Sequence, residues 1–326
     1  MATTEAELGN LLHLSAVSGN GHLWHTIRYE SGNWSPFIDV EGEAGDIGFV
    51  VMTDLQSMGG PVHLCAINGA GDMFHTYRRP DGTWLPFEDV KAKAGDVGPF
   101  DGLGICATGG FRDGQLHIFG VTTHSNKIYH AILKADGATW VNFIDVEGAT
   151  QAGEIGQVYQ VTCTGDVYPA AYDLHLCAST LDGNLWHTIR GGDGRWMRFE
   201  SVKVRGAGDP GKFIDITCEM VGRDLHLFGV TEGGRLWHTV RNPGTGVFSP
   251  FKEVIVAGGS GYVYWVGIGG SNSLLQLAAI TSNPQLWHSL RDPLTGTFGP
   301  FGDVEIQAGD LGNPLTVSVH GLNVLS

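Results

Sequence analysis

The sequence of 326 residues predicts an all-β fold, a β-propeller of six four-stranded blades. A short motif, Gly-x-Leu-Trp-His-Thr-Ile-Arg in its fullest form, occurs six times along the chain. The motif histidines lie 50, 55, 57, 51 and 50 residues apart, and a period near fifty is typical of propeller repeats. Each repeat holds four short β-rich runs, and no repeat shows a helical pattern. The repeats are centred on His25, His75, His130, His187, His238 and His288.

Each repeat is expected to contribute four strands in a fixed order. The first strand is a β-branched run such as residues 49–53, and the second is a run such as residues 12–17. The third strand carries the Trp-His motif, and the fourth spans residues 34–40 in the first repeat. Hairpin dipeptides such as Asn20-Gly21 separate the strands, and an Ala-Gly-Asp turn follows the fourth. Four strands in about fifty residues are the signature of a propeller blade.

The two ends of the chain are expected to close the ring. The first repeat starts directly at its second strand, residues 11–17, and has no first strand before it. Residues 315–319 have the pattern of a first strand without a repeat of its own. If this C-terminal strand completes the N-terminal blade, the ring has no open edge between its first and last blades. Residues 1–326 are then a single domain.

Composition excludes several classes of partner. The net charge is 19 − 34 = −15, and both nucleic acid and anionic membranes require basic patches. No apolar run approaches the roughly 18 residues of a membrane span. The acidic, polar start of the chain does not resemble a signal peptide, so a cytoplasmic or non-classically secreted protein is expected. The odd number of cysteines lacks metal or redox spacing and predicts small buried hydrophobic residues: Cys65, Cys106, Cys163, Cys177 and Cys218.

The six motif histidines are interpreted as structural. If Asn20-Gly21 forms a two-residue turn, His25 lies opposite Ala16, and the other five copies likewise face Ala or Gly. A buried imidazole then fills the space beside a small residue, and its nitrogens need partners. Metal ligation and catalysis are the alternatives, but six equal copies form no single cluster, so no metal and no cofactor are expected. The expected partners are the fourth-strand carboxylates of Asp39, Asp89, Asp145 and Asp303.

In the same register, second-strand histidines face third-strand arginines, with His13 opposite Arg28. This polar pair is either structural or part of a ligand site. The third repeat departs from the pattern, because Leu133 replaces the arginine. The aromatic residues of the third and fourth strands either pack between blades or provide stacking surfaces for a sugar ring. The candidate hydroxyl donors are Arg28, Arg190, Arg241 and Arg291. The candidate stacking residues are Trp24, Trp186, Trp237 and Trp287, followed by Trp34, Trp84, Trp140 and Trp196.

The repeated pattern resembles that of the bacterial propeller lectins of the Photorhabdus luminescens lectin type. The likeness rests on a Leu-His-Leu second strand, the Trp-His motif and Asp-Gly-x-Trp-x-Pro-Phe-x-Asp-Val, and it extends from about residue 8 to 319. The resemblance implies a non-enzymatic, sugar-binding propeller with several sites between adjacent blades. It also implies L-fucose or O-methylated sugars as ligands, and homo-oligomers. Members of that family have seven blades, whereas this chain shows six repeats.

These observations favour a multivalent lectin that binds glycans, with fucose or O-methylated sugars as candidate ligands. Near-equivalent weak sites gain strength through avidity, whereas an enzyme needs one distinct site. A propeller glycoside hydrolase is one alternative, and it requires a unique pair of carboxylates roughly 5–10 Å apart. No acidic pair is recognised outside the repeats. A protein-interaction scaffold without a sugar ligand is the other alternative.

Overall fold

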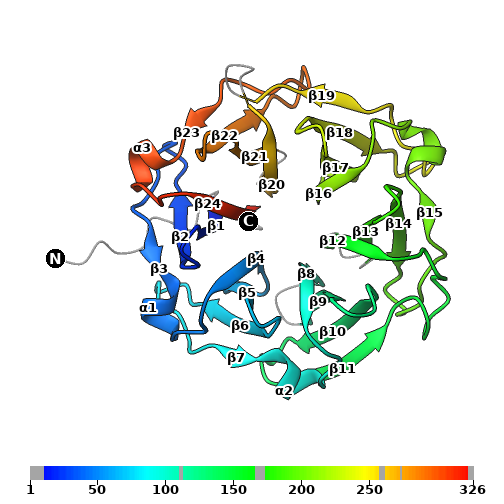
Figure 1. Ribbon diagram of the computed structural model, residues 1–326, viewed down its shortest axis with the longest axis horizontal. Helices are drawn as coiled ribbons and strands as arrows, with labels where there is room; N and C mark the ends of the chain where they lie inside the picture. Colours follow the sequence, from blue (N-terminus) through cyan, green and yellow to red (C-terminus); the bar gives the residue numbers. More distant parts are fainter. Residues whose placement is uncertain (1–10, 110–112, 166–172, 257–260, 272–273, 322–326) are drawn as a thin grey trace.

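The computed structural model describes residues 11–109, 113–165, 173–256, 261–271 and 274–321, and it shows six four-stranded antiparallel sheets in a ring (Figure 1). We call these sheets blades 1 to 6 in chain order, according to the motif histidine that each contains: His25, His75, His130, His187, His238 and His288. The predicted all-β propeller with six blades is confirmed. The strands nearest the axis are β24 (Pro314–Gly321), β4 (Val50–Ser57), β8 (Phe100–Thr108), β12 (Val158–Gly165), β16 (Phe213–Val221) and β20 (Val263–Ser271).

The remaining strands follow outward in each blade. The second strands are β1 (Leu12–Ser18), β5 (Val62–Asn68), β9 (Gln115–Thr122), β13 (Leu174–Thr180), β17 (Asp224–Thr231) and β21 (Leu274–Thr281). The third strands are β2 (Leu23–Arg28), β6 (Met73–Arg78), β10 (Ile128–Lys134), β14 (Leu185–Arg190), β18 (Leu236–Arg241) and β22 (Leu286–Arg291). The outermost strands are β3 (Ile38–Asp39), β7 (Glu88–Asp89), β11 (Trp140–Asp145), β15 (Glu200–Ser201), β19 (Lys252–Val254) and β23 (Gly302–Asp303).

The ring closes as the sequence predicts. Strand β24 pairs with β1, so blade 1 has the order β24-β1-β2-β3 and joins the two ends of the chain. In Figure 1 the red C-terminal strand lies beside the blue strand β1. The edge hydrogen-bonding groups of β1 are therefore paired, which removes a template for aggregation.

The outer strands are shorter than predicted, and short helical turns follow them. In blade 1 the pairing is limited to Ile38–Asp39 and a separate bridge between Arg28 and Trp34, with Pro36 between them. Proline lacks the N–H that a continuous ladder requires. The expectation of no helix is wrong at this point, because Asp39 caps a one-turn helix and accepts a hydrogen bond from Gly42 N. The turns are α1 (Val40–Ala44), α2 (Val90–Ala94), η1 (Lys203–Ala207) and α3 (Glu305–Ala308), all too short to show a helical period in sequence.

The predicted register between the second and third strands is wrong by one residue. Ser15, not Ala16, lies opposite His25, and Ala16 lies opposite Trp24. The turn has three residues rather than two: Ser18 N donates to His22 O at 3.0 Å, and Gly21 has φ +80°. Such three-residue hairpin loops place a glycine in the left-handed region. A one-residue slip moves every side chain to the other face, so the expected contacts of the histidines change completely.

The small residues of the second strand make room for the start of the first strand instead of for histidine. A Cβ on Gly120 would meet the Phe100 ring at 2.4 Å, and a Cβ on Gly229 would meet the Phe213 ring at 2.4 Å. In the other four blades alanine replaces this glycine, and the residue equivalent to Phe100 at the start of the first strand is smaller. In blade 2, for example, these residues are Ala66 and Val50. Close packing of this kind is sensitive to a single added methylene group.

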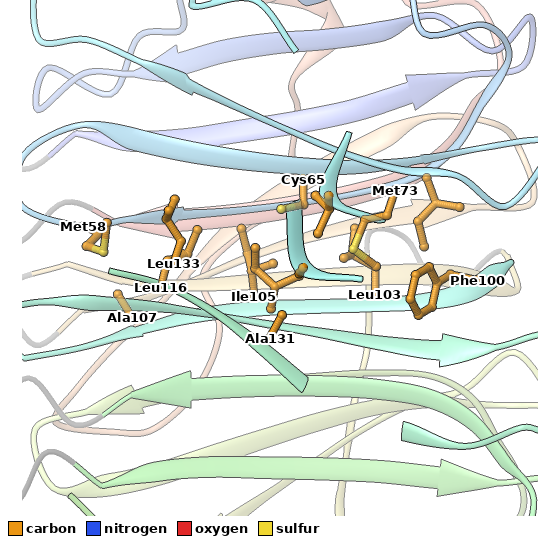
Figure 2. Close-up of a cluster of buried hydrophobic side chains, with 14 residues drawn as sticks. Met58, Cys65, Met73, Phe100, Leu103, Ile105, Ala107, Leu116, Ala131 and Leu133 are labelled. Carbon is orange, nitrogen blue, oxygen red and sulfur yellow. The ribbon is translucent and has the colours of Figure 1, made fainter. Parts of the chain in front are cut away.

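Each blade packs one face against the opposite face of the next blade. Figure 2 shows this contact between blades 2 and 3, where Met58 lies near Leu116 and Leu133, and Met73 lies near Leu103. Leu133, at the position that is arginine in the other blades, is fully buried there. Burial of such a side chain typically contributes about 1.5–3 kcal/mol. The five cysteines are all buried free thiols, as the sequence predicts.

Polar side chains link the inner strands of neighbouring blades. Asp54 of β4 accepts a hydrogen bond from Ile105 N of β8 at 2.7 Å, and Asp215 of β16 accepts one from Val266 N of β20 at 2.7 Å. Burial raises the pKa of Asp54 to about 6, that of Asp215 to about 7 and that of Glu219 to about 8. The sequence pattern singles out no acidic pair, and the structure shows that these three acids are buried on the innermost strands. Hydrogen bonds to backbone N–H groups give Asp54 and Asp215 a structural role, because they satisfy edge donors that would otherwise be buried unpaired.

Candidate functional site

Beneath the candidate site, the second-strand and third-strand histidines of each blade pair with each other and not with the arginines. Nδ1 of His13 lies 2.9 Å from Nε2 of His25, and the two rings are stacked at a centroid distance of 5.1 Å. Leu12, not His13, lies opposite Arg28, so the predicted histidine–arginine pairing is wrong. The other pairs are His63–His75, His117–His130, His175–His187 and His226–His238, and in blade 6 Gln276 accepts from His288 at 3.0 Å.

The histidine pairs are neutral. One ring nitrogen donates and the other accepts, which requires at least one unprotonated nitrogen in the contact. Burial lowers the pKa of His13 to about 3 and holds the pKa of His25 well below its ordinary value. The expected fourth-strand carboxylates take no part, because Asp39 caps helix α1 instead. The interpretation of the motif histidines as structural agrees with this burial and pairing.

An aromatic ring of the next blade packs edge-on against the third-strand histidine in five of the six interfaces, and against Phe228 in the interface of blades 5 and 6. Trp84 of blade 2 meets His25 of blade 1 edge-on at a centroid distance of 5.2 Å. The contact crosses the ring closure too, where Trp34 of blade 1 meets His288 of blade 6 at 5.2 Å. Equivalent edge-on contacts are His75–Trp140, His130–Trp196 and His187–Phe248, and in the fifth interface Phe298 meets Phe228.

Five partly buried arginines lie beside these rings without an acidic partner. Arg28, Arg78, Arg190, Arg241 and Arg291 end the third strands and form backbone bridges with the fourth-strand aromatics. Among the described residues, none of the five guanidinium groups makes a hydrogen bond or an ion pair. Burial lowers the pKa of each. Each guanidinium is only partly buried, so it keeps N–H donors accessible to solvent or to a ligand.

Beside each arginine, a glycine in the turn between the third and fourth strands leaves space for the guanidinium group. A Cβ on Gly194 would lie 3.1 Å from Nη2 of Arg190, and one on Gly296 would lie 2.7 Å from Nη2 of Arg291. Both glycines have positive φ, at 85° and 72°, which favours glycine independently of the space. The guanidinium therefore lies close against the turn, in space that a larger residue than glycine would occupy. The recurring Arg-x3-Gly-x-Trp spacing in blades 1, 2 and 4 is a sequence signal for this arrangement that the sequence reading missed.

The arrangement opens into a cleft of about 310 Å³ between blades 3 and 4. Arg190 and Trp196 of blade 4 line one side, and His130 and Ile132 of blade 3 line the other. Hydrogen-bonding side chains of Asn142, Thr150, Gln151 and Arg195 complete the lining. The indole N–H of Trp196 is buried and has no hydrogen-bond partner among the described residues. The cleft thus combines several donors with an apolar wall, which is the composition of a site for a small polar ring.

The structure separates the predicted site residues into two groups. Arg190 and Trp196 come together in the cleft, whereas Trp186 packs against the core cluster of blades 3 and 4 and does not line it. Trp24 and Trp287 are held by hydrogen bonds from their indole N–H groups to Ser18 and Thr281. Trp237 packs against the core of blades 4 and 5. Trp84 and Trp196 are each 6% exposed, which argues against either ring presenting its whole face to a sugar.

The described residues contain no group of three or more histidine, cysteine or acidic side chains arranged to hold a metal ion. In the same part of the chain, no helix is long and apolar enough to cross a membrane. The buried acids Asp54 and Asp215 lie along a narrow axial cavity of about 50 Å³ and not in the arginine cleft.

Comparison with known proteins shows similarity of fold. No family model matches the chain, and no curated protein matches it by sequence. Among solved structures, a fucose-specific lectin from Aleuria aurantia matches with a TM-score of 0.65 at 11% identity, covering 91% of this chain and 92% of that chain. AofleA from Arthrobotrys oligospora matches with a TM-score of 0.60 at 12% identity, covering 99% and 96%. TolB from Acinetobacter baumannii matches with a TM-score of 0.58 at 9% identity, covering 97% and 67%.

The comparisons bear on the number of blades. A further structure of the Aleuria aurantia lectin is described as a six-bladed β-propeller, and it matches with a TM-score of 0.56 at 12% identity, covering 94% of this chain and 98% of that chain. Six blades therefore fit known propellers of this size. At such identities the matches establish the class of fold, a six-bladed β-propeller, and nothing narrower.

Proposed function

We propose that the protein is a multivalent lectin that binds fucose-bearing glycans at the arginine clefts between its blades. The observation that carries the proposal is the fivefold repetition of a partly buried arginine without an acidic partner. A guanidinium offers five N–H donors in a fixed plane, and sugar hydroxyls are suitable acceptors. The net charge of −15 opposes binding of polyanions, so a neutral sugar fits better than an anionic ligand.

Fucose is the sugar that the structural neighbours support. Two matched structures of the Aleuria aurantia lectin are named for fucose recognition, and a third structure of the same lectin is a complex with α-methyl-L-fucoside at a TM-score of 0.59 and 12% identity, covering 92% of this chain and 97% of that chain. A relationship to the Photorhabdus luminescens lectin type rests on the repeated sequence motifs alone, and O-methylated sugars remain candidate ligands on that ground. We assign one site to each of the five arginines and none to the interface of blades 2 and 3, where Leu133 replaces arginine.

The proposed protein is a single domain without catalytic activity. A hydrolase would need two accessible carboxylates beside the ligand, whereas Asp54 and Asp215 are occupied with backbone N–H groups of neighbouring blades. Among the described residues, no carboxylate lines the cleft between blades 3 and 4, and a neighbouring hollow beside Arg190 holds the single carboxylate of Asp113 rather than a pair. Homo-oligomers would raise the number of sites further.

Titration of Arg190→Ala with methyl α-L-fucopyranoside tests this function. Each intact site is expected to bind in the millimolar range, about 4 kcal/mol, because a shallow cleft buries little of a monosaccharide. The variant is expected to lose one site by stoichiometry and to lose disproportionately more binding on a dense fucosylated surface. Arg235→Ala is the control, because Arg235 is exposed and lies outside the cleft.

Three outcomes would contradict the proposal. The first is no fucose binding by the wild-type protein on a glycan array, and the second is an unchanged stoichiometry in Arg190→Ala. The third is turnover of p-nitrophenyl α-L-fucoside, which would favour the hydrolase alternative. Binding of a protein partner without any glycan binding would favour the scaffold.

A further inference from the structure

We propose a second ligand site, of different chemistry, at the mouth of the propeller axis. It takes a small, neutral, mostly apolar ring such as a phenol, and it lies at the end of the ring opposite the guanidinium of Arg190. This site does not depend on the lectin function, because it uses none of the repeated arginines.

The site is built from β-bulges. In every blade the register of the innermost strand shifts at its second residue, which is left unpaired at the end of the sheet. Five of these six bulge residues are apolar or aromatic, and on one side of the ring they are unusually exposed: Tyr159 is 43% exposed, Tyr264 49% and Leu315 37%. The bulge residues are Val51, Asp101, Tyr159, Ile214, Tyr264 and Leu315.

Four consecutive bulge residues surround one cleft of about 370 Å³. Tyr159, Ile214, Tyr264 and Leu315 come from blades 4, 5, 6 and 1, whose innermost strands border the axis side by side in Figure 1. Trp265 lines both this cleft and the narrow axial cavity, so it separates the two. The cleft has the volume range of small-molecule sites, and its aromatic rings are the type of wall that such sites use.

The lining determines the class of ligand. No acid, lysine, arginine or histidine lines the cleft, so it offers no counter-ion to a charged ligand. Besides the hydroxyls of the two tyrosines and the indole N–H of Trp265, its polar side chains are Thr281, Ser282 and Asn313, and the Thr281 hydroxyl already donates to Asn283 O at 2.9 Å. A hexose would bury most of its hydroxyl groups against the apolar walls of Ile214, Ile280 and Leu315, which is less favourable than burial of an aromatic ring. An aromatic ring with one hydrogen-bonding group matches both the apolar walls and the few remaining polar groups.

The two sites lie at opposite ends of the same blades. In blade 4, Tyr159 follows Val158, which pairs with Thr180 at one end of the sheet. Arg190 lies at the other end, opposite Leu174, which also pairs with Gly165. A ligand at the axial mouth therefore leaves the arginine free.

Titration with 4-fluorophenol followed by fluorine NMR tests the site directly. The wild-type protein is expected to broaden the fluorine signal saturably, and Tyr264→Ala and Tyr159→Ala are each expected to weaken binding at least tenfold. Leu315→Glu adds a charge to the cleft without removing an aromatic wall, and it should also abolish binding. Phe49→Ala is the matched control, because Phe49 is 52% exposed just before strand β4 but does not line the cleft.

Ligand competition separates this proposal from the sugar sites. Saturating methyl α-L-fucopyranoside is expected to leave 4-fluorophenol bound, and the anionic 4-fluorobenzoate is expected not to bind. Displacement of 4-fluorophenol by the fucoside would place the ring in a sugar cleft and overturn the proposal. Absence of binding to the wild-type protein, or equal binding by folded Tyr264→Ala and Tyr159→Ala, would overturn it as well. If the protein sediments as a dimer and does not bind 4-fluorophenol, this apolar end is an interface between copies instead.

Discussion

Replacement of Arg78 by leucine is expected to abolish one sugar site and to leave the fold at least as stable as before. Within the part of the chain that the structure describes, the buried Nε of Arg78 has no hydrogen-bond partner, and burial lowers the pKa of the guanidinium. Glu43 and Asp81 influence that pKa, but neither forms an ion pair with Arg78. Blade 3 gives the precedent for the exchange, because Leu133 occupies the same position and is fully buried.

The size of the effect follows from the burial of the arginine. Leaving one buried donor unpaired is unfavourable by about 1–3 kcal/mol, and leucine removes that donor. Most of the apolar gain is already present, because the arginine stem buries its own methylene groups. We therefore expect the free energy of unfolding to stay constant or to rise by about 1 kcal/mol. For a chain of 326 residues this rise corresponds to a melting temperature about 1.5 °C higher.

Urea denaturation measures the change in the free energy of unfolding, and titration with methyl α-L-fucopyranoside measures the number of sugar sites. Arg79→Leu is the control, because Arg79 is the next residue in sequence and is exposed. A destabilisation of Arg78→Leu by more than about 1 kcal/mol, with an unchanged number of sugar sites, would make the arginine a structural residue. That result would refute the reasoning, because it requires a stabilising partner that the guanidinium lacks among the described residues.

Three further predictions concern the framework of the ring. His187→Ala should lower the free energy of unfolding by about 2–4 kcal/mol without changing sugar specificity, because it leaves a cavity beside Cys177 and deprives His175 of its partner at 2.9 Å. His187→Gln should lose less stability, because a glutamine, Gln276, already pairs with His288 in blade 6. Lost sugar binding at an unchanged melting temperature would contradict this prediction. Stability should fall as the pH falls from 6.5 towards 4, because burial lowers the pKa of His63 to about 4 and that of His13 to about 3, so the unfolded chain takes up protons first. The acids whose pKa burial raises most, Asp54, Asp215 and Glu219, act in the opposite sense between pH 4 and 8, but these three are outnumbered by the five histidine pairs. Urea midpoints that rise on acidification would contradict the prediction. Deletion from residue 315 onward should leave β1 without its partner β24 and lower the melting temperature or the solubility, and an unchanged melting point of a soluble truncated protein would disprove the closure.

The sequence predicts the blades and their closure because these depend on repetition. The fifty-residue period, the four β-rich runs and the first-strand pattern near Leu315 are all visible without tertiary information, and β24 indeed pairs with β1. The register is not predictable in the same way, because it depends on one turn. The loop at Asn20 has three residues where the Asn-Gly pair suggests two, and this single residue moves Ser15 in place of Ala16 to the position opposite His25.

The site is predicted in part for a related reason. Arg190 and Trp196 were named from their repetition, and the structure brings both into one cleft. Their surroundings come from blade 3, about fifty residues earlier, and no local pattern shows that Arg190 lacks an acidic partner. The axial cleft is even less accessible to sequence reasoning, because Tyr159 and Tyr264 occupy equivalent bulge positions that only the strand pairing reveals.

A crystal structure of the protein soaked with methyl α-L-fucopyranoside tests the central claim most directly. The account predicts sugar density against the guanidinium groups of Arg28, Arg78, Arg190, Arg241 and Arg291, and none at the interface where Leu133 replaces arginine. Sugar bound away from these arginines, or equally at the Leu133 interface, would contradict it.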